Sequence, residues 1–209
     1  MHGRTTVPAL LLTTLVAAAC GGADTGETEA PQAEMTAAAV ELDCYIARGT
    51  FEETQQRPSP LRSVDIRLGD GEGLLCYGAP SANDREVMGH LVPYGQPWRI
   101  GANEPTTLHV STAANVGGVT VQPGSYSLYA IPGESEWTFY VNSNWERWGI
   151  PIDESVRSTE VGSFTVTPET TDEPVETLTY EWVPSGVTGG ELVITWENTR
   201  LSFPITAAG

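Results

Sequence analysis

The chain has 209 residues with a strong acidic bias, 27 Asp and Glu against ten cationic side chains, for a net charge of −17. All ten cations are arginine, so the absence of lysine excludes Schiff-base chemistry and lysine-bound phosphate sites. The negative field repels nucleic acid and anionic lipid, and we predict no nucleic-acid partner. We interpret the charge as an adaptation to solubility or salt, with a role in partner recognition as the alternative.

The N-terminus has the layout of a bacterial lipoprotein signal peptide, which we assign to residues 1–19. One cation, Arg4, precedes an apolar run from Ala9 to Val16, and small alanines then lead to Cys20. In this interpretation signal peptidase cleaves before Cys20, which is then acylated on its sulfur and its amine, so that a lipid anchor replaces a membrane span. The apolar run is shorter than the roughly 18 residues that a spanning helix needs. The alternative is a plain secreted protein in which this cysteine is incidental.

Residues 20–41 are predicted to form a flexible acidic tether that begins with the lipidated cysteine. They are rich in Gly, Ala, Thr, Pro and Glu and contain no aromatic residue, so they bury too little apolar surface to fold. Gly21 stands where an Asp would retain a lipoprotein at the inner membrane. We therefore expect an exported protein of the bacterial cell envelope, at the outer membrane or facing the periplasm, whose lipid anchor at Cys20 binds the membrane.

Cys44 and Cys76 are the two cysteines that remain after lipidation of Cys20, and an even pair in an exported protein predicts a disulfide. The bond would close a loop of about 30 residues and stabilise the fold by about 3–4 kcal/mol in the chain-entropy model. The alternative is a reactive or metal-bound thiol, which requires a base or further ligands nearby in sequence. Neither is evident.

Residues 42–209 are numerous enough for one domain with a substantial core, and their dominant signal is a period of two. Apolar and polar residues alternate in residues 137–141, 177–182, 192–196 and 201–205, which predicts antiparallel strands with one core face and one wetter face. Turn signals rich in Gly and Pro recur about every 8–12 residues. We predict an all-β fold, a single antiparallel β-sandwich of about 8–10 strands, jelly-roll or immunoglobulin-like, in which Tyr126 forms a structural corner.

Several motifs between Arg57 and Thr206 resemble the bacterial domain of unknown function 2911 family. They are Arg57–Pro60, Tyr77–Ser81, Leu91–Gly95, Trp98–Arg99, Gly101–Glu104, Thr106–Thr107, Pro123–Gly124, Tyr126–Leu128, Ile131–Gly133, Trp137, Pro174–Thr177 and Trp196–Thr199. The resemblance implies a β-rich exported domain, often found on lipoproteins, with no established activity, so it transfers no catalytic residue. Two positions depart from the family pattern, since His90 replaces a common glycine and Ile100 a common threonine.

The candidate ligand-binding residues lie in one aromatic and charged stretch. They are His90, Tyr94, Trp98, Arg99, Asn103 and Glu104. Glycines at positions 95 and 101 permit tight turns, so the donor fork of Arg99 and the carboxylate of Glu104 can point into one pocket. Trp98 would then offer an apolar platform for a sugar or a peptide. In the structural alternative these polar side chains satisfy the backbone groups of a long loop, and Glu104→Gln lowers stability.

The histidines of the domain do not predict a metal site. His90 and His109 are nineteen residues apart, and His109 alternates with an inward leucine on its strand, so we expect its side chain to face solvent. His90 is the better candidate ligand or base, with a loop histidine of no role as the alternative. The loop from residue 142 to residue 160, with Trp145 and Trp148, either covers a pocket or caps the core. We predict no metal and no cofactor.

The leading functional interpretation is a non-catalytic binding or scaffolding module of the cell envelope, with a glycan or a peptide as its ligand. It rests on absences, since no serine has the Gly-x-Ser-x-Gly frame of a hydrolase and no acidic pair stands out as a glycosidase pair. The alternative is an envelope hydrolase that acts on a glycan, ester or peptide, with Glu104 as acid or base and Arg99 stabilising negative charge. Enzymatic activity is left open.

Overall fold

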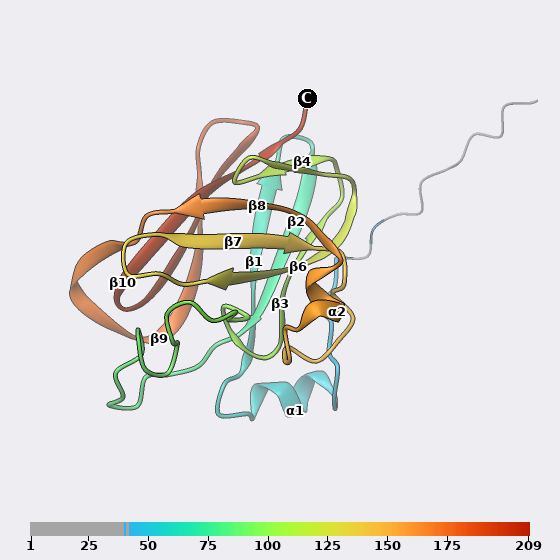
Figure 1. The fold of residues 1–209 in the computed structure, drawn as a ribbon. Helices are drawn as coiled ribbons and strands as arrows, with labels where there is room; N and C mark the ends of the chain where they lie inside the picture. Colours follow the sequence, from blue (N-terminus) through green and yellow to red (C-terminus); the bar gives the residue numbers. More distant parts are fainter. Residues whose placement is uncertain (1–39, 41) are drawn as a thin grey trace, which may run out of the picture. The chain divides into compact units, whose positions relative to one another are not determined.

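The computed structural model describes residue 40 and residues 42–209, which fold into two antiparallel β-sheets packed together (Figure 1). The predicted signal peptide, nearly all of the tether and Cys20 lie outside these residues. Within the described part, no helix has the length and the apolar character that crossing a membrane requires. The predicted all-β sandwich is confirmed, because the two sheets together contain ten strands.

The larger sheet has six strands in the order β1-β2-β3-β6-β7-β8, each antiparallel to its neighbours. These strands are β1 (Leu61–Leu68), β2 (Gly71–Gly78), β3 (Ala102–Val110), β6 (Gly124–Ile131), β7 (Trp137–Asn142) and β8 (Glu160–Val166). In Figure 1, β6, β7 and β8 run across the direction of β1 and β2, so the sheet is strongly twisted.

The smaller sheet has four strands in the order β5-β4-β10-β9. They are β4 (Ala114–Val116), β5 (Val119–Val121), β9 (Glu169–Pro184) and β10 (Gly189–Ala207). Two short helices complete the described elements, α1 (Phe51–Gln55) and α2 (Glu154–Arg157). After β3 the chain leaves the larger sheet and forms the hairpin of β4 and β5, in which β4 pairs with β10. This hairpin therefore connects the two sheets.

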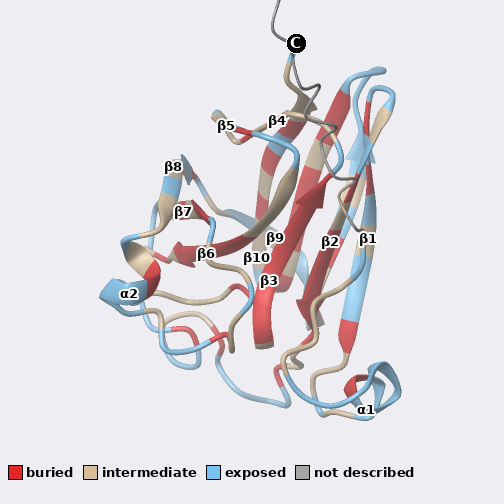
Figure 2. Ribbon diagram, turned by 90° about the vertical axis from the view of Figure 1, so that its right-hand side faces the viewer, coloured by how far each residue is buried: buried red, intermediate tan, exposed pale blue. Residues whose placement is uncertain are grey.

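Apolar side chains fill the space between the sheets, as the period of two predicts. On β7, Trp137, Phe139 and Val141 are each at most 1 % exposed, whereas Thr138 and Tyr140 between them are only partly buried. Figure 2 shows long buried stretches on β3 and β10, one strand from each sheet. Because fully burying a large apolar side chain contributes about 1.5–3 kcal/mol, this shared core is the main source of the fold's stability.

A glycine turn joins β1 to β2, and the predicted tyrosine corner is present. Gly69, in the connection between these strands, has a φ of 65°, a conformation that glycine adopts without steric cost. The hydroxyl of Tyr126 donates to the carbonyl of Gln122 at 3.0 Å. This bond gives the tyrosine the structural role that the sequence indicated.

The outer face of the six-stranded sheet, which points away from the core, carries a second buried layer, and this layer is polar. Its members are each at most 1 % exposed: Thr107, His109, Ser127, Tyr129 and Asn142. Two covering segments bury them, residues 42–48 and residues 143–159, and both lack strands. For example, the Ser127 hydroxyl donates to the Asn144 carbonyl at 2.9 Å, and Asn142 Nδ2 donates to the Val156 carbonyl at 2.6 Å.

The prediction that His109 faces solvent is wrong. Its place on the outer face of β3 is as expected, because its neighbour Leu108 points into the core, but the covering segments leave the histidine only 1 % exposed. The alternation along a strand determines the sheet face that a side chain occupies. Whether the side chain is buried depends on what covers that face.

A disulfide joins Cys44 to Cys76, as predicted, with a Cα–Cα distance of 5.6 Å. Cys76 lies on the outer face of β2 and is 1 % exposed. The bond therefore fastens the first covering segment, residues 42–48, to the sheet beneath it.

Candidate functional site

Two of the predicted site residues, His90 and Tyr94, lie at the surface. The side chain of His90 is 71 % exposed, and its Nε2 lies 3.3 Å from the carboxylate of Glu86, an exposed pair of the kind that adds little stability. Tyr94 is 40 % exposed and borders a cavity of about 190 Å³. Within the described residues, neither side chain forms a hydrogen bond or an ion pair with Arg99 or Glu104.

Trp98 packs in the core instead of forming an open platform. Its ring stacks on Trp196 with a centroid distance of 5.8 Å and meets Trp137 edge to face at 5.9 Å. Its backbone N–H and carbonyl both bond to Ala130 of β6, at 2.8 and 2.9 Å. Because other tryptophan rings of the protein already cover this indole, Trp98 contributes to packing between the sheets and offers no open face to a ligand.

The backbone is strained at Ile100 and Asn103, where the chain enters β3. Both have positive φ, 64° and 46°, and for a β-branched residue such as Ile100 this costs about 1–3 kcal/mol. The Ile100 carbonyl accepts hydrogen bonds from the hydroxyls of Tyr180 and Thr106, at 2.7 and 3.1 Å. Asn103 Nδ2 donates to the carbonyl of Ser59 at 2.9 Å. The polar side chain of Asn103 therefore satisfies a backbone carbonyl of the neighbouring loop.

Glu104 is the buried centre of a charged network that also contains Arg57 and Arg99, which we call the Glu104 network. The glutamate is 1 % exposed, and its Oε2 accepts a hydrogen bond from Arg57 Nη1 at 2.7 Å. The other carboxylate oxygen, Oε1, has no hydrogen-bond partner among the described residues. A buried carboxylate paired in this way is closed to a substrate, and removal of its charge leaves buried arginine uncompensated.

Arg99 lies beside the same carboxylate. Burial lowers the pKa of Arg99 because it desolvates the charged form, and the Glu104 charge opposes this shift. The backbone at Gly149 passes close by, since its N–H donates to the Asn103 carbonyl at 3.1 Å. A Cβ at Gly149 would stand 2.4 Å from Arg99 Cδ, so only glycine fits. The second covering segment, residues 143–159, thus closes over the Glu104 network.

A larger cavity, of about 510 Å³, lies over the outer face of the sheet beside His109. Its walls come from the first covering segment, from β3 and β6, and from the second covering segment; they include Asp43, Tyr45, Ile46, His109, Ser125 and Trp145. The Trp145 ring meets Tyr45 edge to face at 5.5 Å and His109 at 5.4 Å. We call this space the His109 cavity.

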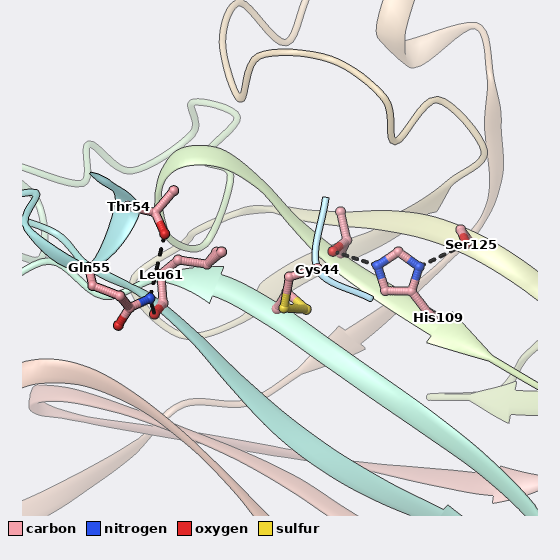
Figure 3. The surroundings of a disulfide bond; sticks show 8 residues. Cys44, Thr54, Gln55, Leu61, His109 and Ser125 are labelled. Atoms are coloured by element: carbon pink, nitrogen blue, oxygen red, sulfur yellow. Dashed lines mark hydrogen bonds between the residues drawn. A yellow bond between two sulfur atoms is a disulfide. The ribbon is translucent and has the colours of Figure 1, made fainter. Parts of the chain in front are cut away.

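His109 is fixed by hydroxyl groups at both ring nitrogens. Nδ1 lies 2.7 Å from Ser125 Oγ, and Nε2 lies 3.0 Å from Thr107 Oγ1; Figure 3 shows the ring beside Ser125. Burial lowers the pKa of His109, with the charge of Asp43 acting in the opposite direction. The imidazole is therefore neutral at pH 7, with one nitrogen donating and the other accepting.

The sequence did not predict the His109 cavity as a site. It indicated only that the loop with Trp145 and Trp148 could cover a pocket. The walls of the cavity are separated by up to about a hundred residues, so no local motif joins them. The usable signals were the loop of residues 142–160, interpreted as a possible cover, and the cysteine pair, which places residues 42–48 against β2. In the described part of the chain, no group of three or more His, Cys, Asp or Glu side chains is arranged to hold a metal ion.

A comparison with protein families identifies one match. The family model described as "Protein of unknown function (DUF2911)" matches residues 59–205, which confirms the resemblance carried by the sequence motifs. No curated protein matches the chain significantly, and neither does a solved structure. The match includes β3, β6 and the second covering segment, whereas the first covering segment and Arg57 precede it.

Proposed function

Because the chain belongs to the DUF2911 family, whose description names no activity, we propose a function from the geometry: an exported, lipid-anchored module of the cell envelope that binds a neutral saccharide. The observation that carries this proposal is the His109 cavity. It combines an indole, a phenol ring, a carboxylate and a hydroxyl group around a volume of about 510 Å³.

The wall chemistry of the His109 cavity fits a sugar ring. Saccharides present apolar C–H faces and a rim of hydroxyl groups, which proteins bind with aromatic side chains and a few oriented polar groups. Trp145 and Tyr45 supply the aromatic wall, Asp43 supplies an acceptor, and Ser125 supplies a hydroxyl held by His109. Asp43 and the overall charge of −17 disfavour an anionic ligand in this cavity.

Binding without turnover is the better-supported form of the proposal. The hydrolase alternative assigned acid or base chemistry to Glu104, but this carboxylate is 1 % exposed and paired with Arg57. A general acid or base must reach the proton that it transfers, directly or through one water molecule. Glu104 has no such access, so the geometry offers the hydrolase alternative no support at its proposed residue.

The location in the envelope rests on the N-terminal sequence and on the cysteines. A signal-like segment ends at Cys20, and the domain contains the Cys44–Cys76 disulfide, a bond typical of oxidising compartments. The expected result is that Cys20→Ser abolishes lipid attachment, measured by mass spectrometry of the intact protein, and moves the chain from the membrane fraction to the soluble fraction. Membrane association that persists in the variant would contradict the anchor.

Isothermal titration of the full chain with neutral malto-, cello- and chito-oligosaccharides tests the saccharide site. We expect one series to bind and Trp145→Ala to weaken its affinity by at least about tenfold, because the variant removes the aromatic wall. Trp148→Ala is the matched control: Trp148 lies in the same loop, but its ring contacts Arg48 instead of lining the His109 cavity. The proposal fails if Trp145→Ala binds as the wild type does, or if neutral peptides bind and saccharides do not.

A further inference from the structure

The Glu104 network is one part of a larger cationic feature. Removal of the signal peptide leaves nine arginines against 27 acidic residues, yet three of those arginines are linked through Trp148, Gly149 and Glu104. We infer that this arginine cluster, Arg48, Arg57 and Arg99, binds a small oxyanion, a carboxylate or phosphate group. The site shares no residue with the His109 cavity and goes beyond the proposed saccharide function.

Four contacts connect the arginines to one another and to their neighbours. The guanidinium carbon of Arg48 lies 4.2 Å from the centre of the Trp148 ring, a cation–π contact. Arg57 bonds through Nη2 to the carbonyl of Arg48 and through Nη1 to Glu104. Arg99 packs against the Gly149 backbone, where a Cβ would stand 2.4 Å from its Cδ. The cluster is therefore built by neighbouring residues of one loop and by the carboxylate that this loop covers.

The charges of this cluster do not balance. Glu104 pairs with Arg57 and its charge also acts on Arg99, so one carboxylate faces three guanidinium groups. The ion pairs found among the described residues include neither Arg48 nor Arg99. Glu53, close to Arg48 in sequence, is engaged by the backbone N–H of Thr50 at 2.7 Å as part of a helix cap. The arginine cluster thus carries surplus positive charge.

Arg99 also has hydrogen-bonding capacity that the protein does not use. Its Nε is buried and has no hydrogen-bond partner among the described residues, and the residue as a whole is only partly buried. A guanidinium is a rigid planar fork of donors that matches the oxygens of a carboxylate or a phosphate. An oxyanion at this position satisfies both the surplus charge and the unused donors.

The strongly negative net charge of the chain does not prevent such a site. At physiological ionic strength, fields between exposed charges are screened over about 8 Å. The arginines closest to a bound anion therefore outweigh distant acidic residues. Because added salt shortens this screening distance, oxyanion binding should weaken as the salt concentration rises.

Calorimetric titration of the full chain with inorganic phosphate and with succinate, each against sodium chloride at equal ionic strength, tests the inference. We expect at least one of the two probes to bind, and the tighter one identifies the preferred oxyanion. Arg99→Gln should weaken binding by at least about tenfold. Arg48→Gln, a change at an exposed residue that tests the site without disturbing a buried charge, should weaken it by several-fold.

Arg67→Gln is the matched control, because Arg67 is an exposed arginine at the end of β1 that lies away from Arg57, where it pairs with Glu72. It should bind both probes as the wild type does. Trp145→Ala should also retain oxyanion binding, so a failure of the saccharide proposal remains distinguishable from a failure of this one. The inference is overturned if neither probe binds beyond chloride, or if Arg48→Gln and Arg99→Gln titrate like the wild type.

Discussion

The Glu104 network and the His109 cavity are both polar, and both lie beneath the second covering segment, but they differ in charge and in access. Glu104 is a buried carboxylate with an arginine bonded at 2.7 Å and glycine backbone packed over it. His109 is a buried neutral ring bonded to hydroxyls at the floor of a space of about 510 Å³. The protein closes off the carboxylate of Glu104 itself, whereas the space beside His109 leaves room for a saccharide.

The difference shows that the most distinctive sequence motif need not be the ligand site. The charged residues of the stretch that ends at Glu104 draw attention because buried charges require partners, and here the partners are largely internal. The His109 cavity uses ordinary residue types, and its chemistry arises from their convergence. Each region therefore predicts a different response to substitution.

The largest expected effect is the loss of stability in Glu104→Gln. The variant removes the counter-charge of Arg57 and Arg99 in a nearly closed site, which should lower the free energy of unfolding by about 3–5 kcal/mol. Urea unfolding of the full chain measures it. Glu72→Gln is the control, since Glu72 pairs with Arg67 at 2.9 Å but both side chains are more than half exposed, and it should change stability by less than about 1 kcal/mol. An equal loss of stability in both variants would show that the buried Glu104 pair is no more important to the fold than the exposed Glu72 pair.

The next largest effect concerns the disulfide that fastens the wall of the His109 cavity. Replacing Cys44 and Cys76 by serine should destabilise the fold by about 3–4 kcal/mol and weaken saccharide binding, because Asp43 and Tyr45 lose their attachment to β2. Unfolding and titration of the same double variant measure both quantities. Wild-type protein treated with a reductant should match the double variant. Full saccharide affinity without the disulfide would mean that the segment of residues 42–48 holds its place unaided.

A smaller effect is the pH dependence contributed by His109. Because the pKa of His109 is lowered in the folded state, the unfolded chain binds a proton first, near its ordinary pKa of about 6.5. Stability from this residue is therefore complete above that pH and is lost as pH falls through it. We expect the stability of His109→Gln to fall less steeply than that of the wild type between about pH 7 and pH 5.

The control for the pH experiment is His90→Gln, since the side chain of His90 is 71 % exposed. Its stability should follow the wild-type pH profile. Parallel profiles for wild type and His109→Gln would show that His109 is not held neutral in the fold.

Much of the fold could be predicted from the sequence because its signals are local. Trp137, Phe139 and Val141 repeat every second residue, which is the geometric period of a strand, and Tyr126 follows a Pro-Gly turn. The positive φ at Ile100 could not be predicted, because isoleucine disfavours that conformation and only tertiary hydrogen bonds to its carbonyl maintain it.

The candidate site was predicted less well, because burial and convergence are long-range properties. The sequence placed Arg99 and Glu104 together correctly, but it did not reveal that Arg57 would take one oxygen of the carboxylate. For His109 it indicated the correct sheet face, but the covering segment that buries the ring lies more than sixty residues earlier, fastened at Cys44. A period of two carries no information about such a cover.

The location of the ligand site can be tested with the indole N–H resonances of the six tryptophans in one solution NMR titration with the saccharide that binds best. Trp145 lines the His109 cavity, whereas Trp98 is stacked on Trp196 beside the predicted stretch. If the saccharide binds in the His109 cavity, the Trp145 resonance shifts with ligand concentration while the Trp98 resonance stays in place. A shift of the Trp98 resonance with the Trp145 resonance unchanged would place the ligand at the stretch that ends at Glu104 and rule out the His109 cavity as the binding site.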